Sequence, residues 1–488
     1  MGGPRYRRLL TLALALSLTA FLFVQPGLLG AGINDEAEHL HAAWLMAVRG
    51  LSPLHGFFEH HLPLLWYVLG LGFRAGMKGP ESLYWARLLV LACAALWCGA
   101  LLSLVRVWSR DAARGDMALA SFAAVAVFAQ DLVVVRPETL AFGLLAGSLL
   151  IWSRRNGRLA AAFAGGVLFG GTIFASPRFV LLAPVFLLVE MDEGAPLQTI
   201  LTRACALIAG TAVAGGAIIF WLVPLQDLIF DLRFSAFLQG IGLPAQIDMR
   251  YLGACILIPV LFGAIGLGNA AIPRRQLLAW GLNGALAWGV CLLSSGAHAY
   301  SQAFAPALLW TTLFVAWLES RPRPAHDPSR RLEAIAISGM LATTATLVGF
   351  GSGSMFSAAA LTTSRRILLD TLPPGATVLL PYPYHPITAD DASYWGASLM
   401  VDSPGRLCAA VDAYRQRYPR SPVSLPPCSL LTDLRTRRPS AVYRDLAVIG
   451  APEEYFQIDS AIQTEYESTD SLAGAPTPTF GSYVVFRK

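Results

Sequence analysis

The sequence predicts an all-α polytopic membrane protein that ends in a small α/β domain, and three observations predict it. The chain is 55% hydrophobic and only 14% charged, and one water-soluble core cannot bury that much apolar surface. Apolar runs close to the roughly 20 residues of a membrane-spanning helix recur along the first three quarters of the chain. After Leu361 the apolar runs shorten to strand length.

The apolar runs predict about eleven transmembrane helices. Two runs, 140–152 and 179–189, are short for a span, so they need flanking residues or a place beside a cavity. The nine longer runs are 9–33, 88–105, 117–130, 159–176, 204–223, 252–272, 277–297, 304–318 and 335–361.

The arginines predict the orientation of these helices. They cluster at alternate ends of the runs, at 5–8, 106–114, 154–158, 203, 274–275 and 321–331. By the positive-inside rule these ends are cytoplasmic, which places the N-terminus inside and both the loop 31–86 and the tail outside. Counting 62–76 as a span would reverse this scheme, so we expect a re-entrant or interfacial helix there. We therefore expect a multi-pass protein of a bacterial inner membrane.

The N-terminal run has two interpretations. Residues 5–32 have the basic start, apolar stretch and small residues of a secretory signal. The apolar stretch is long for a signal, so we favour an uncleaved anchor. Either interpretation brings Asp35 out on the same face of the membrane.

The tail 362–488 is expected to form a compact extracytoplasmic module. Residues 376–380 and 441–449 have the pattern of strands, and 405–417 that of a helix. Its alternative role is a lid or a stabilising cap. Cys408 and Cys428 both lie in this tail, where an oxidising compartment would allow a disulfide between them. The domain boundary is therefore predicted between residues 361 and 362.

Ionisable residues crowd the start of the first outer loop. Asp35, Glu36 and His39 follow the first apolar run, and five of the eight histidines fall between residues 39 and 61. Such a cluster beside a membrane is a candidate site. A structural alternative remains, because Asp35 with Glu38 three residues later is also a helix-capping pattern.

A divalent cation at this loop is a second open question. His39 lies one helical turn after Asp35, so Asp35, Glu36 and His39 are candidate ligands for a cation such as Mg or Mn. No metal-specific spacing of residues supports this interpretation.

The order of features in this loop resembles the GT-C superfamily of integral-membrane glycosyltransferases. An acidic pair follows the first span, and a helix and a turn at Gly50 and Pro53 lead to an aromatic stretch around Glu59 that precedes an apolar helix. The branch of protein O-mannosyltransferases and the bacterial aminoarabinose transferase of lipid A is the most similar. The resemblance implies a GT-C-like catalytic domain over residues 1–361.

The resemblance also implies roles for single residues. Asp35 matches the functional acid of the family, Glu36 completes the pair, and Glu59 matches the second acidic position. His60 and His61 stand where the family has a lysine and a proline, so they become the substrate-binding candidates at this point.

Two further segments at the outer ends of spans are candidates for substrate binding. Arg136 and Glu138 flank a proline, and an arginine can bind two phosphate oxygens at once. Their alternative role is a proline-initiated helix start. His298 and Tyr300 are similar to a polar segment of the family, although Tyr300 also fits an aromatic belt.

Asp227 and Asp231 lie in the outer loop 226–250, and for this loop we expect a solvated amphipathic segment without a site function. The histidine and carboxylate cluster of the first loop is thus the main candidate.

These features predict a glycosyltransferase that moves a monosaccharide, with inversion, from a polyprenyl-phosphate carrier in the membrane to an extracytoplasmic acceptor. A base near the acceptor and cations near the departing phosphate are what such chemistry needs. Nucleic acid is not an expected partner, because the arginines follow the topology. The alternatives are a transporter or flippase of a lipid-linked sugar and a non-catalytic relative that only binds lipid carriers. The sugar and the acceptor are left open.

Overall fold

The computed structural model describes twelve stretches of the chain. They form two compact units. Unit 1 takes in Leu89–Leu222 and Gly242–Gly353 together with Met1–Gly27, and unit 2 takes in Leu28–Leu88, Val223–Ile241 and Ser354–Lys488. The described residues are 34–59, 61–108, 135–153, 158–192, 194–241, 272–295, 304–319, 376–379, 387–395, 404–444, 453–468 and 483–487.

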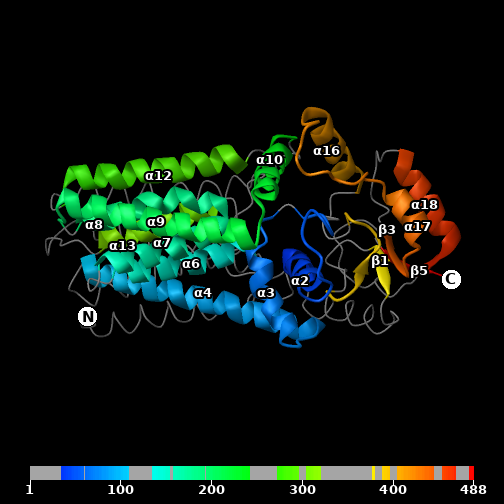
Figure 1. The fold of residues 1–488 in the computed structure, drawn as a ribbon, viewed down its shortest axis with the longest axis horizontal. Helices are drawn as coiled ribbons and strands as arrows, with labels where there is room; N and C mark the ends of the chain where they lie inside the picture. Colours follow the sequence, from blue (N-terminus) through cyan, green and yellow to red (C-terminus); the bar gives the residue numbers. More distant parts are fainter. Residues whose placement is uncertain are drawn as a thin grey trace, which may run out of the picture. The chain divides into compact units, whose positions relative to one another are not determined.

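Unit 1 is a bundle of apolar helices (Figure 1). The short predicted runs 140–152 and 179–189 are helical, as α6 and as η3 with α8. The predicted spans 9–33, 117–130 and 335–361 and nearly all of 252–272 lie outside the described residues, so the number of spans stays a prediction. The helices are the later part of α4 (Gly79–Trp108), α6 (Pro137–Trp152), α7 (Arg158–Ala175), η3 (Pro177–Leu182), α8 (Ala183–Asp192), α9 (Leu197–Trp221), α12 (Arg274–Ser295) and α13 (Ala305–Glu319).

Helices α7 and α9 approach each other closely through small residues. A Cβ atom on Gly166 would lie 2.1 Å from the Leu207 carbonyl oxygen, and one on Gly210 would lie 2.1 Å from the Phe163 carbonyl oxygen. Backbones can come this near only where side chains are absent. This small-residue packing is typical of helix pairs in membranes, where no hydrophobic effect drives helices together.

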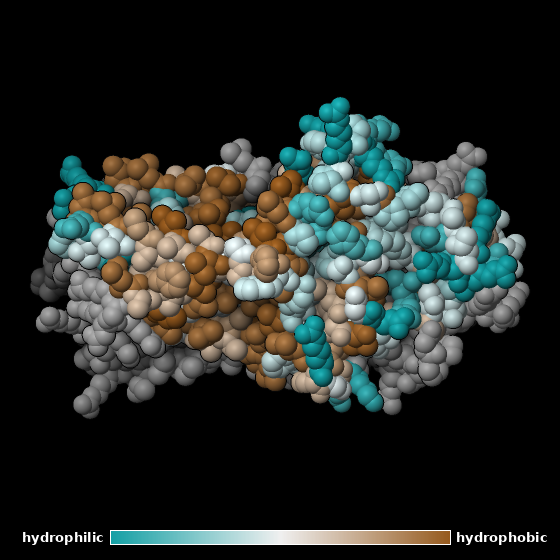
Figure 2. All heavy atoms as spheres, in the orientation of Figure 1, coloured by the Kyte–Doolittle hydropathy of each residue, from teal (hydrophilic) through white to brown (hydrophobic). Residues whose placement is uncertain are grey.

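The outer faces of unit 1 are apolar. Two of the described helices, Glu81–Val105 and Leu197–Trp221, are long and apolar enough to cross a bilayer. Phe220 on α9 is 80% exposed, and Leu201, Ile208 and Trp221 on the same helix are exposed as well. Figure 2 shows such hydrophobic side chains gathered over the helices of unit 1. An apolar surface of this kind is expected to be covered by lipid and not by water.

A buried ion pair joins α8 to α9. The Arg203 guanidinium pairs with the Glu190 carboxylate and donates a second hydrogen bond, of 2.7 Å, to the Trp152 carbonyl oxygen. It also lies 4.3 Å from the centre of the Trp152 ring. Arg203, counted above with the cytoplasmic arginines, therefore also holds three helices of the bundle together.

Unit 2 combines the first loop with a mixed sheet. Helices α2 (Asn34–Ala47) and α3 (Leu64–Arg74) pack on each other, and the sheet has the strand order β2-β1-β3-β5-β4. Strands β2, β1 and β3 are parallel, whereas β3, β5 and β4 are antiparallel. The remaining elements are α10 (Leu225–Ile241), α16 (Pro404–Arg417), α17 (Leu430–Arg437), α18 (Glu453–Glu465), β1 (Thr377–Leu379), β2 (Asp390–Asp391), β3 (Ala441–Arg444), β4 (Tyr466–Ser468) and β5 (Tyr483–Arg487).

Most elements predicted in unit 2 are present. The strands expected at 376–380 and 441–449 occur as β1 and β3, and the helix expected at 405–417 is α16. The solvated amphipathic segment expected at 226–250 is wrong in part, because Asp227 and Asp231 of helix α10 are buried. Phe230, Phe234 and Phe237 recur on one side of this helix and pack against an apolar core, which is why the segment folds instead of staying in water.

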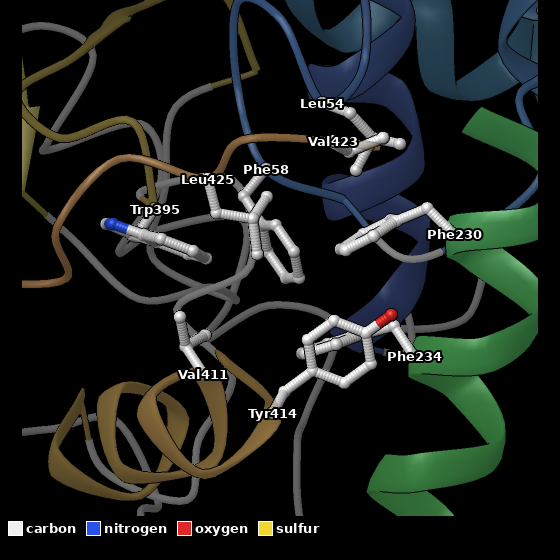
Figure 3. Close-up of a cluster of buried hydrophobic side chains, with 9 residues drawn as sticks. All are labelled: Leu54, Phe58, Phe230, Phe234, Trp395, Val411, Tyr414, Val423 and Leu425. Carbon is white, nitrogen blue, oxygen red and sulfur yellow. The ribbon is translucent and has the colours of Figure 1, made fainter. Parts of the chain in front are cut away.

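An aromatic cluster forms this core of unit 2 (Figure 3). The Phe58 ring lies 4.6 Å from the Trp395 ring and 5.3 Å from the Phe234 ring, measured between centroids. A disulfide between Cys408 and Cys428 ties α16 to the segment that carries two cluster residues. The cluster therefore fixes Phe58, the residue that precedes Glu59. Its members are Leu54, Phe58, Phe230, Phe234, Trp395, Val411, Tyr414, Val423 and Leu425.

Candidate functional site

The acids of the first loop lie at the start of α2. The helix begins at Asn34, so Asp35 is in its first turn, where a carboxylate complements the partial positive charge of the helix end. The Asp35 side chain, His60, His298 and Tyr300 lie outside what the structure describes, so the roles predicted for them stay predictions.

Glu36 is engaged in an ion pair. Its Oε2 accepts a hydrogen bond of 2.8 Å from the Arg87 guanidinium at the start of α4, and both side chains are buried. Paired in this way, the Glu36 carboxylate is held in place, and the Arg87 guanidinium balances its negative charge. This contact gives Glu36 a structural part in the site, in addition to the acidic pair predicted with Asp35.

Glu59 is the centre of the buried polar group. Its side chain is fully buried, and its Oε1 accepts hydrogen bonds from the His61 backbone N–H, at 3.3 Å, and from His61 Nδ1, at 2.8 Å. A hydrogen bond also joins it to Glu38 of α2. Burial, followed by the negative charge of Glu59 and this hydrogen bond, raises the pKa of the Glu38 carboxyl well above its ordinary value. Burial and the neighbouring carboxylate thus favour the protonated form of the Glu38 carboxyl.

His39 completes this group. Its Nδ1 accepts a hydrogen bond of 3.2 Å from the Trp66 indole N–H of α3, and its ring meets the His61 ring edge-on at 5.2 Å. Because Nδ1 accepts, neutral His39 carries its proton on Nε2.

These contacts bear on the predicted cation site. Among the side chains that the structure describes, no group of three or more His, Cys, Asp or Glu residues could hold a metal ion. Glu36 is already paired with Arg87, and one nitrogen of His39 already accepts a hydrogen bond. Because the Asp35 side chain lies outside the described residues, the expected ligand set of Asp35, Glu36 and His39 stays a prediction.

Helix α10 adds two acids that the sequence analysis assigned to solvent. Asp227 and Asp231 are only 5% and 4% exposed. Burial, with the negative charges of Asp227 and Glu59, raises the pKa of Asp231 well above its ordinary value. The Oδ1 atom of each makes no hydrogen bond within the described part of the chain. Their spacing of four residues was a signal, because it places both acids on one face of the helix.

One of these acids has a histidine partner. His55 Nε2 lies 2.9 Å from Asp227 Oδ2, and the His55 side chain is about half exposed. The loop 51–59 thus contacts α10 just before Glu59, which brings carboxylates from three separate parts of the sequence near one another.

The later part of α2 is bound to the strand β2 region. His41 donates to the Ile387 carbonyl oxygen from Nδ1 and to Asp391 Oδ2 from Nε2, both at 2.9 Å, while Arg49 pairs with Asp390 at 2.8 Å. Burial acts to lower the pKa of His41, but the Asp391 carboxylate, with help from Ile387 and Asp390, raises it above its ordinary value. The raised pKa favours the charged form of His41, which links the first loop to the tail.

Arg136 and Glu138 belong to unit 1. Arg136 is buried in an extended conformation just before α6, Pro137 is in the first turn, and the Arg136 carbonyl oxygen accepts from the Thr139 N–H at 3.0 Å. The alternative role as a proline-initiated helix start is confirmed. Binding of phosphate by Arg136 stays a prediction.

Known structures resemble this chain in fold. No protein-family model matches it, and no curated protein matches it. ArnT from Cupriavidus metallidurans, solved bound to undecaprenyl phosphate, superposes with a TM-score of 0.53 at 16% identity, over 98% of this chain and 97% of ArnT. The arabinofuranosyltransferase AftD from Mycobacteria superposes with a TM-score of 0.52 at 17% identity, over 99% of this chain.

The chain spans 40% of the length of AftD and nearly the whole of ArnT. At 16–17% identity, the likeness to these two proteins shows a shared fold. This shared fold agrees with the fold that the resemblance of the first loop implied.

Proposed function

We propose that this protein is a membrane glycosyltransferase that moves a monosaccharide from a polyprenyl-phosphate carrier to an acceptor hydroxyl on the extracytoplasmic side. The observation that carries the proposal is the buried carboxylate group around Glu59, on the first loop of a chain with a GT-C fold. The presence of undecaprenyl phosphate in ArnT, which has nearly the same length, supports a lipid-phosphate donor.

The transfer would proceed in one displacement. A carboxylate of the first loop takes the proton of the acceptor hydroxyl, whose oxygen forms a bond to the anomeric carbon as the bond from that carbon to the phosphate oxygen breaks. Polyprenyl phosphate leaves with the electron pair, and the configuration of the sugar inverts.

Three different residues carry out these tasks. Asp35 serves as the base, because Glu36 is engaged by Arg87. Glu59 is a buried, hydrogen-bonded carboxylate that orients a hydroxyl group of the bound sugar. A cation is needed to stabilise the negative charge that grows on the departing phosphate, and Arg136 is the residue that the sequence predicts for this task.

The test is transfer of labelled sugar by the purified protein in lipid nanodiscs. Undecaprenyl-phosphate donors carrying different monosaccharides are offered with an envelope extract as the acceptor. The wild type is compared with Asp35→Asn and Glu59→Gln at equal folded amounts, and Glu81→Gln serves as the control because Glu81 is an exposed acid of the same loop. We expect transfer by the wild type and by Glu81→Gln, with losses of at least about a hundredfold in the other two variants.

Two outcomes contradict the proposal. Equal transfer by all four proteins would remove the first-loop acids from the chemistry. Movement of the intact lipid-linked sugar across the bilayer, with no transfer from any donor, would identify a transporter.

A further inference from the structure

The loop 51–59 leads into Glu59 and has an unusual backbone. Leu54 has a positive φ of 64°, a left-handed conformation that leucine rarely adopts. Its backbone N–H donates to the Phe57 carbonyl oxygen at 2.8 Å, which closes a tight turn. A non-glycine residue keeps such a conformation only where surrounding contacts hold it there.

Tyr394, more than 300 residues away in the sequence, supplies two of those contacts. Its phenol O–H donates to the Leu54 carbonyl oxygen at 2.8 Å, and its own carbonyl oxygen accepts from the Phe58 N–H at 2.7 Å. One residue thus holds both ends of the turn. The second bond ends on the residue directly before Glu59.

Packing restrains the same segment. The Phe58 ring lies against Trp395, at 4.6 Å between centroids, and Tyr394 meets Trp395 edge-on at 5.0 Å. The Leu54 side chain is buried in the aromatic cluster. Because these rings leave little space for the backbone to shift, the two hydrogen bonds set the position of the chain as it enters Glu59.

We propose that Tyr394 is a positioning residue for Glu59, so that the tail of the chain helps to build the catalytic site instead of only covering it. The inference rests on the proposed function for the role of Glu59. In the proposed role Tyr394 touches no reacting atom. It acts by holding the loop, and a carboxylate displaced by about 1 Å can lose a large part of its catalytic effect.

Tyr394→Phe tests the inference with little disturbance. The substitution keeps the ring contacts and the backbone bond to Phe58 but removes the O–H bond to Leu54. Tyr418→Phe is the matched control, because Tyr418 packs against the same aromatic cluster. Removing the Tyr418 hydroxyl leaves both hydrogen bonds between Tyr394 and the loop intact. Three quantities are measured in nanodiscs: kcat, the KM for the lipid donor, and amide hydrogen exchange in peptides covering residues 51–62.

We expect Tyr394→Phe to lower kcat about tenfold or more, with an unchanged KM and a nearly unchanged melting temperature. Exchange in the loop should become faster in this variant and stay as in the wild type in Tyr418→Phe. A residue that only stabilised the fold would lower activity in proportion to the folded fraction.

Several results would overturn the inference. Unchanged loop exchange in Tyr394→Phe would mean that the hydroxyl does not hold the turn, and faster exchange with unchanged kcat would mean that the turn does not position Glu59. A fall in kcat matched by the folded fraction would leave Tyr394 a structural residue. Absence of transfer by the wild type counts against the proposed function instead, and the exchange experiment still decides whether Tyr394 holds the loop.

Discussion

The variant Glu38→Gln removes the titratable proton of the buried carboxyl pair but keeps a hydrogen-bond donor at this position. Folding favours the protonated form of Glu38, because burial and the charge of Glu59 raise its pKa well above its ordinary value of 4.5. A glutamine side chain has nearly the same shape and its N–H can still donate to Glu59, but it cannot titrate. We therefore expect the variant to keep its transfer activity within about threefold at neutral pH.

The sign of the pH effect follows from proton linkage. Between its unfolded pKa and its raised folded pKa, Glu38 binds more protons in the folded state, so the free energy of unfolding falls as the pH rises. This stabilisation is complete below the unfolded pKa and is lost as the pH rises through the folded pKa. The slope reaches at most about 1.4 kcal/mol per pH unit for one carboxyl group. Asp231, whose pKa is raised as well, adds a slope of the same sign.

The assay is denaturant unfolding in nanodiscs between roughly pH 5 and 8, followed by tryptophan fluorescence. The wild type should show a slope to which Glu38, Asp231 and His41 all contribute, and Glu38→Gln a slope smaller by up to about 1.4 kcal/mol per pH unit. Glu81→Gln, at an exposed acid, should behave as the wild type does. An unchanged slope in Glu38→Gln would refute the assignment of a bound proton to Glu38.

Three further predictions concern stability. Arg203→Met should lower the free energy of unfolding by about 3–5 kcal/mol through loss of its buried ion pair, whereas Arg274→Met at an exposed position should change it by less than about 0.5 kcal/mol; equal effects in thermal unfolding would contradict the structural role. Replacing both Cys408 and Cys428 by alanine should cost roughly 3 kcal/mol, because their disulfide closes a loop with a sequence separation of 20, and treatment of the wild type with reductant should lower its melting temperature as much. Arg438→Gly should stabilise the protein by roughly 0.5–1 kcal/mol, because Arg438 caps α17 with a φ of 47° that favours glycine; a lower melting temperature would show that the arginine side chain contributes more than its backbone costs.

The sequence alone was sufficient for much of the architecture. The apolar runs located the described helices of unit 1, including the short α6 and α8, because a helix that faces lipid has a local composition that no distant residue changes. The acid and histidine pattern of the first loop made this loop the main candidate site. The resemblance of the loop to GT-C enzymes then indicated Glu59. Strand and helix patterns also located β1, β3 and α16 in the tail.

Only the tertiary structure decided what those acids contact. The bond from His41 to Asp391 spans 350 residues of sequence and that from His55 to Asp227 spans 172. Hydropathy and spacing describe a segment and its near neighbours, and they carry no record of which distant segment will cover it. Asp227 and Asp231 were therefore assigned to solvent, although the folded chain buries them.

The same limit applies to Tyr394 and to Glu36. Nothing near Tyr394 in the sequence connects it with Leu54, and nothing near Glu36 indicates that Arg87 will pair with it. The sequence by itself determined which segments are helices, and which loop is rich in the side chains that the chemistry needs. The tertiary structure decided which of these side chains are paired, which have a raised pKa and which distant residue contacts the loop, because burial and charge pairing arise only when distant segments pack together.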